Sequence, residues 1–325
     1  MYWKRFGADM ENFIYSINAT IPVFLVMIIG YLLKQFDILD EHFAAKANKF
    51  NFQITLPALL FQDIATTDMR SDFDLKYVLF CAIVTSICFW GIWGVSKIFV
   101  KDDSIRGAFV QGSFRGSAAV FGIAFIMNIY GNSGMAPLMI IGAVPLYNIY
   151  SVIVLTFEAE DKEQGKGNIK KACINICKNP ILLAILFASI FSLTGWYNLL
   201  PFIVTKTVSN IANMASPLAL ICIGVTFEGR KALAKIKPTI YAAFYKLALQ
   251  PAIFLPMAIS MGFTKEKLVA LIIMLGSPTT PSCYIMAKNM KNDGVLTSSI
   301  IVATTLLSSV TLTLWIFIVR SLGYL

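Results

Sequence analysis

Long hydrophobic runs, separated by short charged segments, account for most of this chain. A run of about 20 apolar residues, rising about 1.5 Å per residue as a helix, is long enough to cross a hydrocarbon core of roughly 30 Å. With charges and turn signals as boundaries, the pattern predicts an all-α polytopic membrane protein of ten transmembrane helices. The predicted spans are 13–33, 50–62, 77–96, two within 107–157, 179–194, 207–227, 238–263, 268–287 and 295–319.

Turn and proline signals inside the hydrophobic runs refine this pattern. The stretch 107–157 has Arg115 as its only charged residue, and the Gly-Asn-Ser-Gly turn signal at 131–134 divides it into two spans. The second span is short and contains Pro57, which predicts an interruption of that helix.

The two halves of the chain resemble each other. Residues of the same kind recur at similar offsets: 158 between Pro22 and Pro180, 160 between Pro57 and Pro217, and 165 between Ser117 and Ser282. Because five is an odd number, two five-span units joined by one loop must have opposite orientations in the membrane. We therefore predict two inverted repeats, 1–157 and 179–325, joined by a cytoplasmic loop over 158–178.

Composition supports the membrane assignment and decides the orientation. Only 14% of the residues are charged and 57% are hydrophobic, whereas a soluble domain carries about 25% charged residues. With the N-terminus outside, seventeen Lys and Arg residues fall in cytoplasmic loops and eight outside. The positive-inside rule therefore predicts a multi-pass protein of the cell membrane (the bacterial inner membrane) with both termini outside. It also explains the net charge of +9 without nucleic-acid binding.

Motifs for catalysis, cofactors and metals are missing from the sequence. The one histidine, His42, lies in a loop, and there is no HExxH, P-loop or GxSxG. Cys173 and Cys177 have no further Cys or His with which to complete a zinc set. We therefore predict no enzymatic activity, no cofactor and no metal site.

The ninth span carries the most informative motif, Gly-Ser-Pro-Thr-Thr-Pro-Ser at 276–282. Two prolines three residues apart remove backbone donors and should open the helix at mid-membrane. Ser282 is suited to cap the second half-helix, whose positive dipole end would attract a carboxylate. Pro278, Thr279, Thr280 and Ser282 are therefore candidate substrate-binding residues, although a plain proline kink is the alternative.

The fourth span carries a matching motif, Gly-Ser-Phe-Arg-Gly-Ser at 112–117. An arginine near mid-depth is costly unless it faces water or a partner. Arg115, Gly116 and Ser117 are therefore substrate-binding candidates, with Arg115 pairing with an anion or with carbonyls that the break has freed. Gly112 and Gly116 also form a GxxxG, so close helix packing is an alternative role for the glycines.

Four further polar residues lie within or at the ends of spans. Asn148 of the fifth span is a candidate lining residue or a helix–helix hydrogen bond. Lys246 of the eighth span either snorkels or faces a cavity, where it could take part in coupling or charge pairing. Asp63 and Glu228, which end the second and seventh spans, could bind a coupling proton, pair with Arg115, or simply be solvated.

The order of several short motifs resembles the auxin efflux carrier family, which includes bacterial malate permease-like proteins. The resemblance covers nearly the whole chain and rests on Leu-Pro-Ala-Leu-Leu-Phe at 56–61, Phe114-Arg115 with Phe121-Gly122, Pro217-Leu218-Ala219 with Gly224, Lys246 with Pro251, and Pro278-Thr279 with Met286-Ala287.

This resemblance implies ten helices with external termini, two inverted repeats, and broken fourth and ninth helices that cross at a site for small carboxylates. Ser117 and Ser282 stand where the family usually or often carries Asn, and Ala124 where it usually carries Pro. The substrate is therefore open among malate, another dicarboxylate and a larger, more apolar anion.

We accordingly expect a secondary transporter of small organic anions that works by alternating access. The alternatives are a non-transporting membrane sensor or scaffold on the same fold, and a sodium-coupled organic-anion symporter of a related fold. The expected partners are the carboxylate substrate and the lipid bilayer. The lipid-facing surfaces of the first and tenth spans make a homodimer a reasonable assembly.

Overall fold

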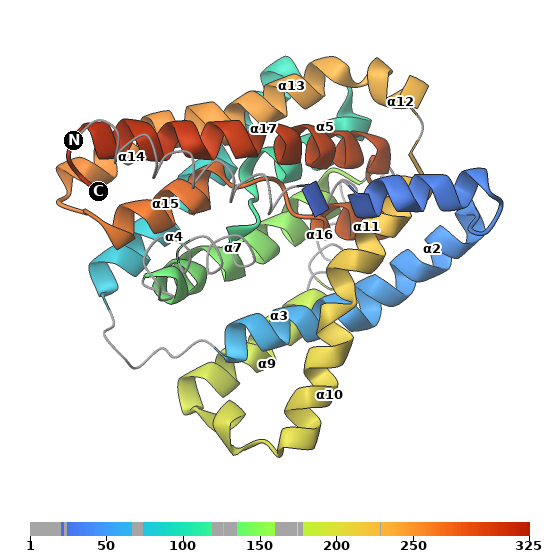
Figure 1. The fold of residues 1–325 in the computed structure, drawn as a ribbon, viewed down its shortest axis with the longest axis horizontal. Helices are drawn as coiled ribbons and strands as arrows, with labels where there is room; N and C mark the ends of the chain where they lie inside the picture. Colours follow the sequence, from blue (N-terminus) through green and yellow to red (C-terminus); the bar gives the residue numbers. More distant parts are fainter. Residues whose placement is uncertain are drawn as a thin grey trace.

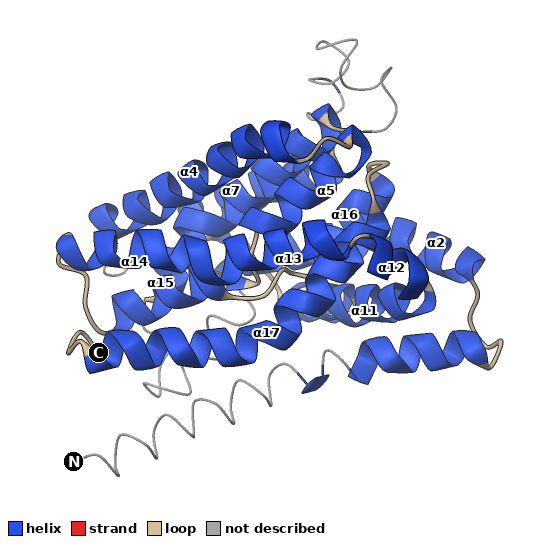
Figure 2. Ribbon diagram, turned by 90° about the horizontal axis from the view of Figure 1, so that it is seen from above, coloured by secondary structure: helices blue, strands red, loops and turns tan. Residues whose placement is uncertain are grey.

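The computed structural model describes residues 21–22, 25–66, 74–118, 126, 135–159, 174, 178–227 and 229–325. Every element of regular structure in these residues is a helix, as Figure 2 shows. The first half contains Leu25–Gln35, α2 (Glu41–Phe50), the π-helix η1 (Asn51–Thr55), α3 (Leu56–Ala65), α4 (Leu75–Phe99), α5 (Asp103–Phe114) and α7 (Ala136–Phe157). The predicted turn at 131–134 lies outside the described residues, as do Phe121, Gly122 and Ala124.

The second half contains a longer series of helices. They are α9 (Pro180–Thr194), the 3₁₀-helix η2 (Trp196–Leu199), α10 (Phe202–Asn213), α11 (Ala215–Val225), α12 (Gly229–Ala234), α13 (Ile236–Phe244), the π-helix η3 (Tyr245–Leu249), α14 (Gln250–Ser260), α15 (Glu266–Gly276), α16 (Ser282–Asn289) and α17 (Gly294–Ser321).

Acidic caps set several helix starts. Asp74, Asp102 and Asp293 precede α4, α5 and α17, and each side chain accepts a hydrogen bond from a backbone N–H of the following first turn. Such caps satisfy donors that the helix itself leaves unpaired. Because these residues stand just before the hydrophobic runs, the helix starts lie within a few residues of the predicted span starts.

Apolar side chains cover the outer surface of the helices. On α4, Leu79, Ile83 and Ile87 are four residues apart and 49%, 55% and 49% exposed, so they form a continuous stripe. The helices long and apolar enough to cross a membrane, in the described part, are Leu75–Phe99, Leu138–Phe157, Phe202–Val225, Ile236–Ser260 and Gly294–Ser321. The chain is thus an all-α, multi-pass membrane protein.

The core surrounds two helices that are buried on all sides. α5 is buried from Ile105 to Phe114, and α15 from Leu268 to Gly276. α5 packs against α4, α7, α13 and α17, and α15 against α7, α14 and α17. A second group, formed by α2, α3, α9, α10 and α11, lies to one side of these helices (Figure 1). The molecule therefore has two groups of helices, which α16 and α7 connect.

The second predicted span differs from expectation, because Pro57 does not interrupt it. One continuous helix runs from Glu41 to Ala65, and the π-turn Asn51–Thr55 precedes the proline. The same arrangement recurs in the eighth span, where the π-turn Tyr245–Leu249 precedes Pro251. A π-turn carries one extra residue, which moves carbonyls away from the proline ring. Each proline is thereby accommodated without a break.

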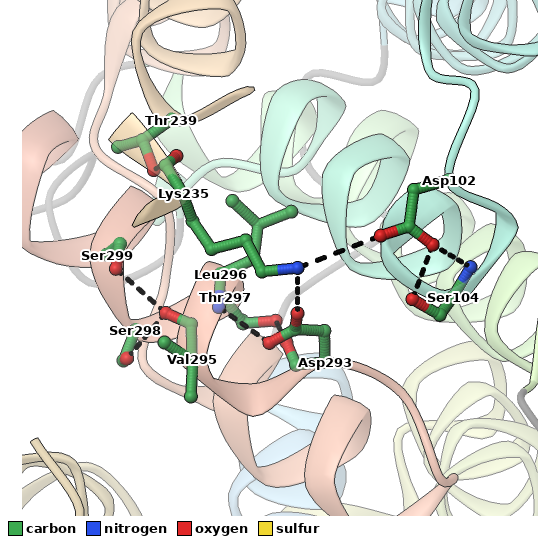
Figure 3. Close-up of polar contacts among 10 residues, drawn as sticks. All are labelled: Asp102, Ser104, Lys235, Thr239, Asp293, Val295, Leu296, Thr297, Ser298 and Ser299. Carbon is green, nitrogen blue, oxygen red and sulfur yellow. Dashed lines mark hydrogen bonds and ion pairs between the residues drawn. The ribbon is translucent and has the colours of Figure 1, made fainter. Parts of the chain in front are cut away.

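Two groups of polar contacts tie the helix ends together at opposite ends of the molecule. At one end, Nζ of Lys235 lies 3.8 Å from Oδ2 of Asp102 and 3.3 Å from Oδ2 of Asp293 (Figure 3). At the other end, Nζ of Lys267 donates to Oδ2 of Asp74 at 2.5 Å, and the backbone N–H of Lys265 donates to the C-terminal segment at Tyr324. Figure 1 shows α12, beside Lys235, and the C-terminus at these two ends.

Candidate functional site

Two openings in the helices lie against each other at the centre of the molecule. α5 ends at Phe114 and Arg115 is extended, at φ −86° and ψ 128°. α15 ends at Gly276 and α16 begins at Ser282, so the predicted opening of the ninth span is present. The backbone N–H of Ser117 donates to the carbonyl of Pro278 at 2.9 Å, which joins the two openings directly.

The prolines explain why α15 ends where it does. In a continuous helix the carbonyl of Met274 would accept from the residue four positions on, but that residue is Pro278, which has no N–H. The carbonyl instead accepts from the Tyr147 hydroxyl at 3.0 Å and from the Lys246 ammonium at 3.1 Å. The break is therefore stable because side chains from other helices bond to the freed carbonyl.

Side chains satisfy the end of α5 in the same way. The Thr279 hydroxyl donates to the carbonyl of Gly112 at 2.8 Å. The Gln250 amide donates to the carbonyl of Ser113 at 2.9 Å. The backbone N–H of Thr279 in turn donates to the hydroxyl of Thr304 at 3.0 Å, so this residue fastens both breaks to α17.

Arg115 lies at the crossing and is 4% exposed. Its Nη2 donates to Oδ1 of Asn148 at 2.8 Å and to Oγ of Ser282 at 2.9 Å. Its Nη1 contacts Sδ of Met286 at 2.8 Å and Oγ of Ser151 at 3.4 Å. Its hydrogen-bond partners in the described part of the chain are thus all uncharged, so the guanidinium keeps its positive charge without a carboxylate.

A cavity of about 40 Å³ lies beside this guanidinium, between the two groups of helices. Polar side chains contribute much of its lining. The lining residues are Leu56, Leu59, Leu60, Asp63, Arg115, Gly116, Ser117, Ala118, Val144, Tyr147, Asn148, Ser216, Thr280 and Ser282. The structure therefore brings together Asp63, Arg115, Gly116, Ser117, Asn148, Thr280 and Ser282 of the candidates from the sequence.

The other candidates lie elsewhere. Pro278 and Thr279 hold the two breaks together and do not line the cavity. Lys246 neither snorkels nor faces the cavity: it is 0% exposed and lies behind Gly116. Freed carbonyls attract its ammonium into the crossing, which explains why both expectations were wrong. Glu228 lies outside the described residues.

The expected cap on α16 was also wrong. Pro281 is the N-cap and makes no side-chain hydrogen bond, and Ser282 is the first residue of the helix. The Ser282 hydroxyl bonds to Arg115 and contacts the Thr280 hydroxyl at 3.3 Å. A buried guanidinium is a stronger partner than a backbone N–H, and it takes the hydroxyl away from the capping position.

Sequence reasoning missed several residues that hold the site. Ser151 follows Asn148 by three residues and therefore shares its helix face, a spacing that could have revealed it. Met286 stood out only in the Met286-Ala287 motif of the family resemblance, with no role assigned to it, and Ser216 gave no signal, because a serine near a helix start is common. The role of Tyr147 depends on the tertiary structure alone, because its partner Met274 is 127 residues away in the sequence.

Comparison with known proteins places most of the chain in a family. Residues 15–316 match the family model described as membrane transport protein. An uncharacterized transporter of Escherichia coli (strain K12), YfdV, is 26% identical over 314 residues, covering 94% of this chain and 98% of the relative. An uncharacterized transporter of Methanothermobacter thermautotrophicus is 22% identical over 311 residues, covering 93% and 98%.

A third relative carries a substrate in its name. The "Putative malonate transporter" of Rhizobium meliloti (strain 1021) is 23% identical over 313 residues, covering 94% of this chain and 96% of the relative. The family model and these relatives confirm the prediction made from the motifs. The chain belongs to the membrane transport protein family, the auxin efflux carrier family that its motifs resemble, and is a membrane transporter.

Proposed function

We propose that this protein is a secondary transporter that moves small organic anions, malate, malonate or another carboxylate, by alternating access. The observation that carries the proposal is Arg115, a buried cation with uncharged partners beside a central cavity. A buried charge without a counter-ion is costly, and a carboxylate entering the cavity would remove that cost.

A second buried arginine shows what a structural role looks like in this chain. Arg106 is 8% exposed and forms ion pairs with Asp103 and with Glu158, the latter at 3.3 Å. Its charge is therefore neutralised within the protein. Among the described residues Arg115 has comparable burial but no ion-pair partner, which is the arrangement expected where the anion is the substrate.

The rest of the lining suits a small carboxylate. Ser117, Asn148, Ser216, Thr280 and Ser282 offer hydroxyl and amide groups that can donate hydrogen bonds to carboxylate oxygens. α16 begins at Ser282, so its positive dipole end also lies at the cavity. The leucines of α3 form the apolar side of the lining. Two to four carbons with one or two carboxylates, as in the malonate named for the Rhizobium relative, match this combination.

The position of the cavity supports alternating access. It lies between the group containing α3 and α11 and the group containing α5, α7 and α16. Sliding or rocking of one group against the other would expose the same lining to each side of the membrane in turn.

We extend the proposal to ten transmembrane helices in two inverted repeats, 1–157 and 179–325, joined by the cytoplasmic loop 158–178. The contacts at the helix ends support this topology. Lys235 joins Asp102 and Asp293, and all three belong to loops predicted to be cytoplasmic. Lys267 and Asp74 pair between loops predicted to be outside, and the C-terminal segment lies with them. Alternate loops therefore meet at alternate ends, as repeated crossing of the membrane requires, and the placement of the N-terminus outside rests on the bias of Lys and Arg between the loops.

A ligand screen tests the substrate class. Purified protein is heated with a panel of mono- and dicarboxylates, with matched amines as controls. Binding to the native state raises the melting temperature, so malonate or malate should stabilise the wild type and not the Arg115→Ala variant. Equal stabilisation of both proteins by every acid, or stabilisation by amines alone, would exclude Arg115 as the anion-binding group.

The coupling of anion transport to protons can be tested at the same cavity, because Asp63 lines it together with Arg115. We propose that a proton on Asp63 accompanies the anion. Carboxylate uptake into liposomes should then respond to a pH gradient at constant membrane potential, and Asp63→Asn should lose that response. A wild type that ignores the gradient and follows the membrane potential alone would show uniport instead.

A further inference from the structure

The surroundings of the Lys246 ammonium resemble those of a bound cation. Its side chain is 0% exposed in the middle of the eighth span. Its ammonium lies 3.1 Å from the carbonyl oxygen of Met274, and 3.5 Å from both the carbonyl oxygen of Phe114 and Oε1 of Gln250. All three ligands are neutral oxygens, and an ammonium donates to such oxygens as readily as an alkali cation binds them.

Two of these oxygens mark the C-terminal ends of half-helices. Phe114 is the last residue of α5, and Met274 lies in the last turn of α15. Both ends carry partial negative charge from the helix dipole and from carbonyls without helical partners. In broken-helix transporters such carbonyls and half-helix ends coordinate the coupling Na⁺. In this chain an ammonium of the protein itself lies there.

A further buried oxygen lies against the same glycine. A Cβ placed on Gly116 would lie 2.5 Å from Oγ of Ser277 and 2.8 Å from Nζ of Lys246, so both atoms pack against this residue. Ser277 is fully buried, and its hydroxyl has no hydrogen-bond partner in the described structure. A buried hydroxyl of this kind is a ready ligand for a small cation.

From this geometry we infer that the Lys246 ammonium is a tethered substitute for a coupling cation. It neutralises the crossing in place of such a cation, so transport needs no Na⁺, and removing the side chain leaves a binding site for a small monovalent cation. The independence of transport from Na⁺ rests on the function proposed above, whereas the cation-binding site rests on the geometry alone. The site is distinct from the carboxylate cavity, because Lys246 and Ser277 do not line that cavity.

The test compares three variants of the purified protein. Lys246→Ala opens the space, whereas Lys246→Met removes the charge but fills the space with a chain of similar length. Lys267→Ala is the matched control, because this lysine bonds to the carboxylate of Asp74 and not to carbonyl oxygens. Melting temperatures are measured in the chloride salts of choline, sodium, ammonium and methylammonium at equal ionic strength.

The inference predicts a specific pattern of melting temperatures. Lys246→Ala should melt several degrees higher in sodium, ammonium or methylammonium than in choline, because a cation binds its native state. The wild type, Lys246→Met and Lys267→Ala should melt alike in all four salts. A Lys246→Ala protein that responds as Lys246→Met does would overturn the binding site.

Wild-type transport gives a second test that requires no variant to fold. Initial carboxylate uptake into liposomes should be the same in sodium and choline. Uptake that requires sodium would overturn the substitution of Lys246 for a coupling cation. If the wild type transports no carboxylate at all, the proposed function fails, and the melting temperatures still decide the cation site.

Discussion

At the residue scale, Arg106 and Arg115 place the same side chain in two different electrostatic environments. Replacing Arg115 by Met removes a buried charge that has no ion-pair partner among the described residues, so the variant should fold with a melting temperature equal to or above that of the wild type. Its stabilisation by carboxylates should be lost. Replacing Arg106 by Met leaves Glu158 without this partner and should cost about 3–5 kcal/mol.

Thermal unfolding with and without malonate measures both effects. Opposite behaviour, in which Arg115→Met unfolds the protein and Arg106→Met is harmless, would show that Arg115 has a structural role. In Arg115→Met, only the hydroxyls of Ser282 and Ser151 can turn toward other acceptors, so they replace only part of the hydrogen bonding that is lost with the guanidinium.

Gly116 offers a prediction from close approach. A Cβ at this position would come within 2.8 Å of the Lys246 ammonium and 2.5 Å of the Ser277 hydroxyl. Gly116→Ala should therefore cost about 1–3 kcal/mol of stability and reduce uptake. Gly94 on α4 is the matched control, because a Cβ there meets nothing within 4 Å. Gly94→Ala should stabilise by up to about 1 kcal/mol, since alanine favours the helix. Equal melting temperatures for the two variants would contradict the described crossing.

At the scale of the element, the sequence predicted which spans carry prolines but not what each proline does. Pro278 opens its helix because other helices supply donors to the freed carbonyl of Met274. Pro57 and Pro251 leave their helices continuous because a π-turn precedes each of them. Hydrophobic periodicity gives the position and length of a span. It contains no information on partners more than 100 residues away, such as Tyr147, and therefore could not distinguish the two outcomes.

The same argument explains which site residues were predicted. Arg115, Asn148 and Ser282 stood out as polar residues in apolar runs, and the structure brings them together. Lys246 stood out equally, yet its position behind Gly116 depends on the crossing of α5 and α15. Only the tertiary structure contains that crossing.

Pro278→Ala tests the opened element directly. The alanine supplies an N–H four residues after Met274 and removes a helix penalty of about 3 kcal/mol, so α15 should extend through the break. A shift of about 1.4 kcal/mol toward the closed helix suffices for a tenfold loss of uptake. Pro256→Ala on the exposed side of α14 is the control and should leave uptake unchanged. Normal uptake by Pro278→Ala would show that the break is dispensable.

The start of α4 gives a pH prediction. The Lys267 ammonium, and the backbone N–H of Tyr77, lower the pKa of the Asp74 carboxyl below its ordinary value. A lowered pKa stabilises the folded state above the unfolded pKa of about 3.9, and this stability is lost as the pH falls through the folded value. Asp74→Asn keeps the cap and removes the charge. The variant should therefore have a lower melting temperature than the wild type near neutral pH. Its free energy of unfolding should be lower by up to about 1 kcal/mol, because the ion pair is partly exposed.

The melting temperatures of the two proteins should converge as the pH falls from about 4, the ordinary pKa of an aspartate, through the lowered pKa of folded Asp74. A difference that persists unchanged at acid pH would assign the effect of the substitution to packing instead of charge.

At the scale of the whole molecule, the arrangement of loops defines a sidedness that labelling can test. In a background without the native cysteines, Lys265→Cys should react with an impermeant thiol reagent in intact cells, since its loop is predicted to be outside. Lys291→Cys should react only after permeabilisation, because its loop is predicted to be cytoplasmic. The reverse pattern would invert the topology, and reaction of both in intact cells would contradict the ten-span count.

The central claim is that the protein carries a small carboxylate through the cavity beside Arg115, and its most direct test is uptake of labelled malonate and malate into proteoliposomes. The wild type should accumulate at least one of the two acids faster than protein-free liposomes. Arg115→Ala should abolish this uptake, and Ser117→Ala and Ser282→Ala should reduce it. Normal uptake by all three variants would contradict the account.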